Sequence, residues 1–203
     1  HFDDLISSME ATVQILEHNP SAIEHIGSMI LRQAKNNLEY SRMMTFIDGD
    51  PESILAVEMI ANDKNELRDK LEKLKIDLDK QKYGYSTKIL YSITDQQNVW
   101  NIRKAGLGLM MSSPGDFKAI PFVEDTAVDP KVLPEFVKDF DEIVRAHDTT
   151  AGYYGHASVG CMHIRPLINL KSKKEVLKMK SISNEITDLV IKYGGSISGE
   201  HGD

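Results

Sequence analysis

The sequence has 203 residues, of which 31 are acidic and 24 are basic, so the net charge at neutral pH is −7. This length fits one domain or at most two small ones, and a hydrophobic content of 41% can build a core. The acidic balance argues against a nucleic-acid partner, and no run of about eighteen apolar residues predicts a transmembrane segment. The single cysteine, Cys161, excludes an internal disulfide and a thiolate-only metal site, and fits a reducing, cytoplasmic setting.

Helix and strand patterns alternate along the chain. Helices are indicated by apolar residues three or four positions apart and by capping patterns such as Asp63 with Glu66. Strands are indicated by short β-branched or alternating runs. In chain order, the patterns predict a helix over 21–38, a strand over 54–60, a helix from Asp63 to Gly84, a strand over 85–92, a helix from Thr94 to Gly106, a strand over 117–123, a helix from Asp129 to about His147, strands over 150–156 and 161–168, and a helix from Ser172 to Gly194.

The last two strands read as a hairpin, and the strands are few. These features favour an α+β fold in which helices cover a mostly antiparallel sheet, rather than a doubly wound parallel sheet. No strand is followed by G-x-G-x-x-G, and no Walker A sequence is present. If the protein uses a nucleotide cofactor, we therefore expect most of its binding site to lie outside these residues.

The chain starts at His1 without a signal segment and stops at Asp203, directly after the polar cluster 199–202. A natural domain seldom ends inside a candidate site. We therefore expect residues 1–203 to be a fragment of a longer protein.

Three histidines lie in unusual surroundings. His156 and His163 flank the hairpin loop in GHASVGCMH, and His201 follows Glu200 in SGEHGD. Two imidazoles and a carboxylate suit Zn²⁺, Mn²⁺ or Fe²⁺ with positions left open for a substrate, and the hairpin can bring His156 and His163 together. The alternative is that these are loop histidines with ordinary hydrogen bonds, and spacing alone does not decide between the two.

Basic side chains form a second group of candidates. Arg103 on a helix and Lys118 at the start of a strand could each bind a substrate carboxylate, Arg103 in a bidentate way. Arg165 lies two residues after His163 and would share its face of the strand. The more common role of such residues is a solvated charge or a surface ion pair, and this alternative stays open for all three.

Four segments together resemble the C-terminal part of the FAD-linked oxidases of the vanillyl-alcohol oxidase superfamily. They are IRKAGLGLM, KAIPFVEDTAV, GHASVGCMHIRP and GGSISGEHGD, in the family's order. The family includes D-lactate, glycolate and D-2-hydroxyglutarate dehydrogenases, and the resemblance covers most of the chain from about residue 20 onward. The form HASVGCMHIRP most resembles the long bacterial members, in which an iron–sulfur domain is fused to the flavoprotein part.

The resemblance implies a ferredoxin-like cap domain that covers the flavin ring and binds the substrate. An N-terminal domain of the same protein, absent from this chain, would hold most of the FAD, and an iron–sulfur domain is a further expected partner. By similarity, the divalent metal ligands would be His156, His163 and Glu200, the catalytic base would be His201, and the substrate carboxylate would be held by Arg103 and Lys118. Many relatives have Asn-Leu-His where this chain has Cys161-Met162-His163, so a polar contact to the substrate is missing.

This resemblance implies oxidation of a small D-2-hydroxy acid by hydride transfer to FAD. His201 would take the hydroxyl proton, and two cationic side chains would suit a dicarboxylate such as 2-hydroxyglutarate. We expect a cytoplasmic protein, tied to the inner membrane only through an electron acceptor, and no turnover by this chain alone. The alternatives are a metal-stabilised binding or scaffold module without catalysis, and a plain α+β interaction domain whose histidines bind nothing.

Overall fold

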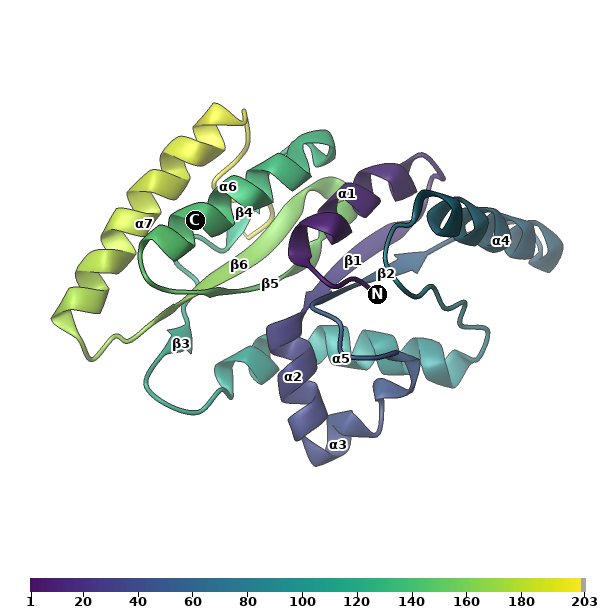
Figure 1. Cartoon of the computed structure of the whole chain (residues 1–203), viewed down its shortest axis with the longest axis horizontal. Coiled ribbons are helices and arrows are strands. Elements are labelled where there is room, and N and C mark those ends of the chain that lie inside the picture. The colour runs from purple at the N-terminus through teal and green to yellow at the C-terminus, as the bar shows by residue number, and fades with distance from the viewer. Residues whose placement is uncertain (202–203) are drawn as a thin grey trace.

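The computed structural model describes residues 1–201, so Gly202 and Asp203 of the GEHGD motif lie outside the described residues. The strands form one sheet in the order β2-β1-β5-β6-β3, with β4 also paired to β6, and every named pair is antiparallel. Helices cover this sheet, which confirms the expected α+β class (Figure 1). The strands are β1 (Ala22–Gly27), β2 (Ser53–Glu58), β3 (Lys118–Ala119), β4 (Asp125–Ala127), β5 (Ala151–His156) and β6 (Cys161–Ile168).

The helices form two groups on opposite sides of the sheet (Figure 1). One side carries α1, α6 and α7, with α6 packed against both α1 and α7, and the other carries α2 and α5. Among the described residues, no helix is both long and apolar enough to cross a bilayer. The helices are α1 (Leu5–Leu16), α2 (Ser28–Asn36), α3 (Leu38–Ser41), α4 (Lys64–Gln81), α5 (Ile93–Met111), α6 (Leu133–Ala146) and α7 (Lys173–Lys192), with short 3₁₀ turns η1 (Met44–Phe46), η2 (Pro130–Val132) and η3 (Ala157–Val159).

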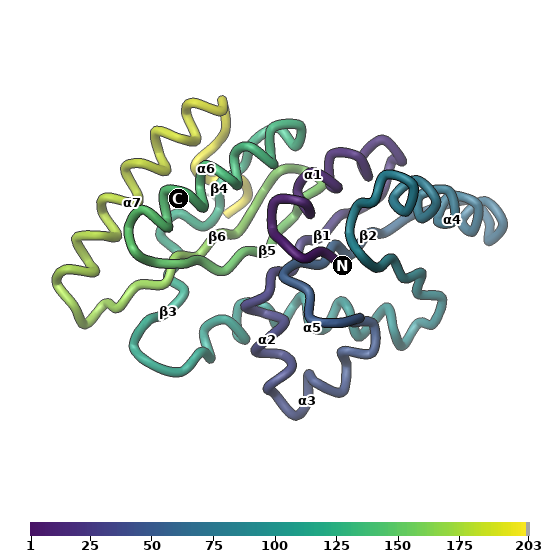
Figure 2. Tube along the Cα trace, viewed as in Figure 1, coloured from purple at the N-terminus to yellow at the C-terminus, as the bar shows by residue number. Residues whose placement is uncertain are grey.

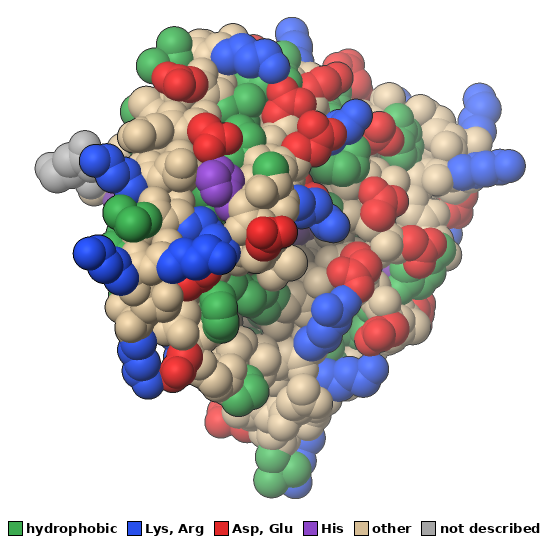
Figure 3. Space-filling model, turned by 60° about the vertical axis from the view of Figure 1, so that its left-hand side comes forward, with side chains coloured by type: hydrophobic (Ala, Val, Ile, Leu, Met, Phe, Trp, Pro, Cys, Tyr) green, Lys and Arg blue, Asp and Glu red, His purple; other side chains and the backbone are tan. Residues whose placement is uncertain are grey.

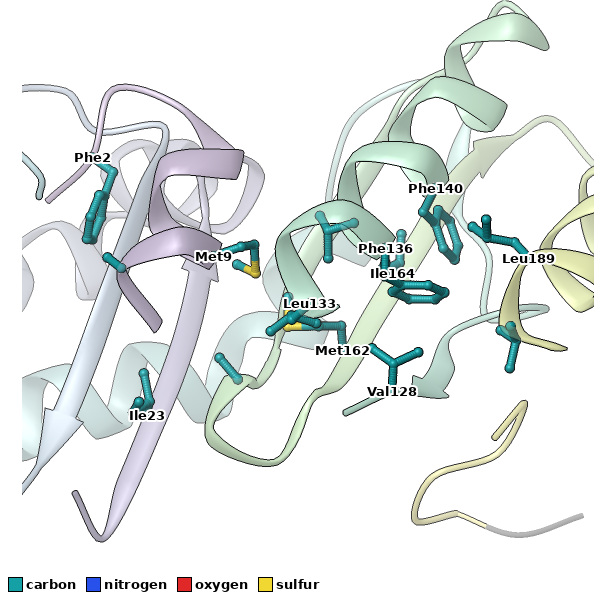
Figure 4. Close-up of a cluster of buried hydrophobic side chains, with 14 of the residues drawn as sticks. Phe2, Met9, Ile23, Val128, Leu133, Phe136, Phe140, Met162, Ile164 and Leu189 are labelled. Carbon is teal, nitrogen blue, oxygen red and sulfur yellow. The ribbon is translucent and has the colours of Figure 1, made fainter. Parts of the chain in front are cut away.

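Alternation along β6 separates a core face from a polar face. Met162 and Ile164 point into the larger core, where they lie close to Phe136 and Phe140 of α6 (Figure 4). The intervening residues His163 and Arg165 point to the opposite face, as period-2 geometry requires. Burial of the α6 aromatic rings therefore fixes which side of β6 carries the polar groups, because a slip of one residue would turn His163 into the core.

The second core lies on the polar side of the sheet but covers only part of it. Ile26 and Tyr154 pack there against α2 and α5. Gly106 allows α5 to lie close to α2, because a Cβ at this position would lie 2.8 Å from Cδ1 of Ile30 and the Ile30 side chain would have to shift. The C-terminal segment returns beside β4, to which it is joined by an isolated β-bridge between Ala127 and Ser196 (Figure 2).

Several boundary predictions are wrong. Residues 21–38 form strand β1 followed by α2, since β1 is central in the sheet and buried on both faces, and this removes the alternation that marks a strand. Residues 85–92 form no strand; single hydrogen bonds, such as Tyr85 N–H to the His1 carbonyl, hold them instead of a ladder. The segment 117–123 contributes only the two-residue β3, and α5 begins after Ser92 and continues past Gly106 to Met111. The sequence patterns gave no indication of α1.

The predicted hairpin and the helices that begin after Asp63 and Ser172 are confirmed. Asp63 caps α4 by accepting hydrogen bonds from the N–H groups of Asn65 and Glu66. Over the face shown in Figure 3, acidic and basic side chains are interspersed, in keeping with the mixed charge of the sequence.

Candidate metal and substrate site

The hairpin of β5 and β6 places two histidines side by side. His156 ends β5 and His163 is the third residue of β6, and their rings meet edge to face with centroids 5.5 Å apart. Gly160 closes the loop between them with a φ of +69°, and a Cβ there would lie 1.9 Å from the Val128 carbonyl oxygen. The tight loop that brings the two imidazoles together therefore requires glycine at this position.

One carboxylate oxygen accepts four of the hydrogen bonds that hold the C-terminal segment against the sheet, in addition to the backbone bonds between Ser196 and Ala127 and from the Gly199 N–H to the Asp125 carbonyl. Oδ2 of Asp125 accepts hydrogen bonds from the backbone N–H groups of Gly199, Glu200 and His201, at 3.1, 3.2 and 2.9 Å, and from the Ser198 hydroxyl at 2.9 Å. Burial raises the pKa of Asp125, but these donors outweigh burial and lower its pKa to about 2. Asp125 is therefore ionised at neutral pH, and its Oδ2 is fully used in anchoring the segment.

Three imidazole nitrogens converge on one oxygen of Glu200. Its Oε1 lies 3.0 Å from Nε2 of His163, 3.3 Å from Nε2 of His156 and 3.6 Å from Nε2 of His201. The rings of His163 and His201 are stacked, with centroids 5.3 Å apart and planes within 4°. The structure thus brings together all four histidine and glutamate residues that the sequence singled out, although they come from three separate segments.

Nitrogen and carboxylate donors in this arrangement fit a divalent transition metal. Asp125 also lies within 4.8 Å of His163, Glu200 and His201 in ligand-atom distances, but its Oδ2 already accepts four hydrogen bonds. His201, which belongs to this group of close donors, and His156, whose Nε2 lies 3.3 Å from Oε1 of Glu200, are therefore both candidate ligands beside His163 and Glu200. The net charge of the site is also consistent with a divalent cation. Two guanidinium groups balance only half of the charge of four carboxylates, so a divalent cation would neutralise the rest. The carboxylates are Glu24, Glu124, Asp125 and Glu200, and the guanidinium groups are Arg103 and Arg165.

The outer nitrogens of two of the imidazoles face carboxylates. Nδ1 of His156 lies 2.6 Å from Oε1 of Glu24, and Nδ1 of His201 lies 3.3 Å from Oε1 of Glu124. A carboxylate at Nδ1 favours the tautomer whose Nε2 lone pair points into the site, which is the form that binds a metal or accepts a proton. Burial lowers the pKa of His163, although nearby carboxylates oppose this, and a lowered pKa favours the neutral imidazole that can act as a ligand.

Of the two predicted substrate-binding cations, the structure brings only Arg103 to the site. Nε of Arg103 donates to Oε2 of Glu24 at 2.7 Å, and the guanidinium lies 4.9 Å from the centre of the Tyr154 ring. Nζ of Lys118 instead donates to the Ser113 carbonyl at 2.5 Å, beyond the end of α5. Among the described residues, Lys118 has no recorded contact with the histidines.

Sequence patterns did not identify Glu24, Glu124 or Tyr154 as site residues. Glu124 lies in the KAIPFVEDTAV segment, which signalled the resemblance but gave no role for this residue, and its Oε2 pairs with Arg165. Glu24 lies in a segment whose pattern predicted a helix and is 132 positions from His156. Its role becomes visible only when β1 is paired with β5, which places Glu24 opposite His156.

The profile of the family described as FAD linked oxidases, C-terminal domain, matches residues 1–203. The chain belongs to this family. It is 30% identical over 197 residues to the D-2-hydroxyglutarate dehydrogenase of Haemophilus influenzae, covering 93% of this chain and 19% of that protein. The D-2-hydroxyglutarate dehydrogenase of Escherichia coli is 25% identical over 210 residues, covering 99% and 21% respectively.

A second kind of relative matches over a shorter region. The glycolate oxidase subunit GlcD of Bacillus subtilis is 28% identical over 92 residues, covering 45% of this chain and 20% of that protein. The chain thus spans about a fifth of the length of the curated relatives it matches. These findings confirm the resemblance to FAD-linked oxidases that the four sequence segments indicated.

Proposed function

We propose that this chain is the substrate-binding cap of an FAD-dependent D-2-hydroxy acid dehydrogenase, with D-2-hydroxyglutarate as its substrate. The observation that carries the proposal is the convergence of three imidazoles on the Glu200 carboxylate, beside the partly buried Arg103. Relatives named D-2-hydroxyglutarate dehydrogenase, similar over 93% or more of this chain, support the choice of substrate over D-lactate or glycolate.

His156, His163 and Glu200 would hold a divalent metal, namely zinc, manganese or iron. When bound, such an ion supplies Lewis acidity to the hydroxyl and carboxylate oxygens of the substrate. FAD, held mainly by an N-terminal domain of the intact protein, supplies the hydride acceptor. The cap residues have a different task, which is to orient the hydroxy acid and to move its hydroxyl proton.

His201 is placed to take that proton. Its Nδ1 faces Glu124, so its Nε2 carries the lone pair, and this nitrogen lies 3.6 Å from Oε1 of Glu200 on the metal side. A proton accepted at Nε2 would give an imidazolium that the Glu124 carboxylate stabilises. Glu124 is in turn paired with Arg165, which holds the carboxylate in place.

Arg103 would bind a substrate carboxylate. Only its Nε is recorded in a hydrogen bond among the described residues, so the terminal nitrogens are available for a planar, bidentate contact. Lys118 stays a predicted second contact, which requires its side chain to leave the Ser113 carbonyl. The FAD domain and an iron–sulfur domain are the partners we propose for this cap in the intact protein.

The decisive experiment is a visible spectrum of the intact protein under anaerobic conditions. We expect D-2-hydroxyglutarate to bleach the flavin bands and its L-isomer to leave them unchanged. Bleaching should be lost in His163→Ala and kept in His147→Ala, a matched control whose imidazole pairs with Glu185 at 2.7 Å outside the site. An intact protein without flavin absorption would refute the proposal and favour a metal-stabilised module without catalysis.

A further inference from the structure

Glu24 is a carboxylate in a buried position of the sheet. It lies on the central strand β1, directly opposite His156 of β5, and is only 8% exposed. An ionised carboxylate buried to this extent is costly unless charged or polar partners compensate. Its two partners are the features of interest, because both belong to the proposed site.

The two oxygens of Glu24 serve different partners. Oε1 lies 2.6 Å from Nδ1 of His156, and Oε2 accepts a hydrogen bond from Nε of Arg103 at 2.7 Å. His156 comes from β5 and Arg103 from α5, so one side chain connects a strand and a helix that bring different chemistry to the site. Both partners are far from Glu24 along the chain, and the fold brings them together.

Each contact restricts its partner in a way that matters for binding. With Nδ1–H donating to Glu24, the Nε2 lone pair of His156 is directed toward Glu200, as a metal ligand requires. With Nε held by Glu24, the guanidinium of Arg103 stays against the Tyr154 ring and presents its terminal nitrogens. Losing the carboxylate would release both restrictions together.

We infer that Glu24 is a positioning residue that holds both the metal ligand His156 and the substrate-binding Arg103 in place. The affinity for the metal and the affinity for the substrate therefore both depend on one carboxylate, which itself binds neither the metal nor the substrate. The inference rests on the proposed function for the roles of His156 and Arg103. It adds a residue that no sequence motif marks and a link between two binding events.

The test measures zinc affinity of the intact protein by competition with a chromophoric chelator, with zinc as the only added metal. We expect Glu24→Gln to bind zinc about 10- to 100-fold more weakly than the wild type, as is usual when the partner of a ligand histidine is lost. The KM for D-2-hydroxyglutarate should also rise about tenfold or more, while kcat falls less, because Arg103 loses its fixed orientation. Glu58→Gln on the neighbouring strand β2, where Glu58 bonds Ser21, is the matched control and should change neither quantity.

A second variant protects the test against loss of folding. Glu24→Gln leaves the partly buried Arg103 charge without its carboxylate partner, so the double variant Glu24→Gln with Arg103→Met removes this charge as well. If Glu24 positions His156, the double variant keeps the weak zinc binding of Glu24→Gln even when its thermal unfolding is normal. A purely structural role predicts instead that zinc affinity recovers together with stability.

The outcomes separate the inference from the proposed function. Wild-type zinc affinity in Glu24→Gln, with zinc binding lost in His163→Ala, would overturn the inference alone and leave the metal site intact. A wild-type protein that binds no zinc would overturn the metal site and this inference together. Flavin bleaching by D-2-hydroxyglutarate is read independently of both, and its absence would refute the dehydrogenase proposal.

Discussion

His25 should make the folded chain sensitive to mild acid. It lies on β1, on the opposite side from Glu24, is fully buried, and contacts the Ser53 hydroxyl through Nε2 at 3.0 Å. Burial lowers the pKa of His25 to about 3, and the positive charge of Arg103 acts in the same direction. In the unfolded chain the pKa of a histidine is about 6.5. Between these two values, the unfolded state binds a proton that the folded state does not.

Acid therefore favours the unfolded state of the chain through His25. Stability is unaffected above about pH 7 and falls as the pH drops from about 6.5 toward 3, by about 1.4 kcal/mol per pH unit and about 4 to 5 kcal/mol in total. Between pH 7.5 and 5.0, His25 alone should therefore cost about 2 kcal/mol of the free energy of unfolding. The substitution His25→Gln removes this titration and keeps an amide that can bond Ser53.

Urea unfolding of the 203-residue chain, followed by circular dichroism at pH 7.5 and 5.0, measures this cost. We expect the wild type to lose about 2 kcal/mol more than His25→Gln between the two pH values. Parallel pH dependences for the wild type and His25→Gln would refute the reasoning.

Three further changes probe the site. Gly160→Ala should destabilise the chain by at least about 2 kcal/mol in urea unfolding, because the residue has a positive φ and the new methyl would meet the Val128 carbonyl; an unchanged midpoint would count against this loop geometry. Asp125→Ala in the intact protein should lower kcat with D-2-hydroxyglutarate at least about tenfold by releasing the segment that carries His201, and wild-type kcat would contradict the anchoring role. Arg103→Lys should raise the KM for the same substrate about tenfold, since a lysine cannot make the planar contact; an unchanged KM in steady-state assays would place the carboxylate elsewhere.

The part of the site that sequence reasoning could predict is the part built from local pattern. Alternation along β5 and β6 with a glycine-rich connection predicts a hairpin that can bring His156 and His163 together, and the polar surroundings mark the pair Glu200-His201 as a candidate. That Glu200 and His201 lie beside the two hairpin histidines, by contrast, is implied only by the family resemblance. The physical cause, four hydrogen bonds to one oxygen of Asp125, is a property of the folded chain.

The part that could not be predicted depends on contacts between distant segments. Strand β1 is buried on both faces, so its apolar residues show no alternation, and the segment reads as the start of a helix. With β1 misassigned, Glu24 has no expected neighbour, although it lies opposite His156 in the sheet. For Lys118, sequence reasoning identified the residue type but not its surroundings, because the carbonyl at Ser113 depends on how α5 ends.

The anchoring of residues 198–201 by Asp125 has a consequence for how the site is assembled. Glu200, a proposed metal ligand, and His201, the proposed base, are neighbours held by the same oxygen. Local opening of this segment therefore removes both groups in one step, and closing restores both. If the two residues have the proposed roles, this route gives no state with the base in place and the ligand set incomplete, so ion binding and readiness for proton transfer would be coupled.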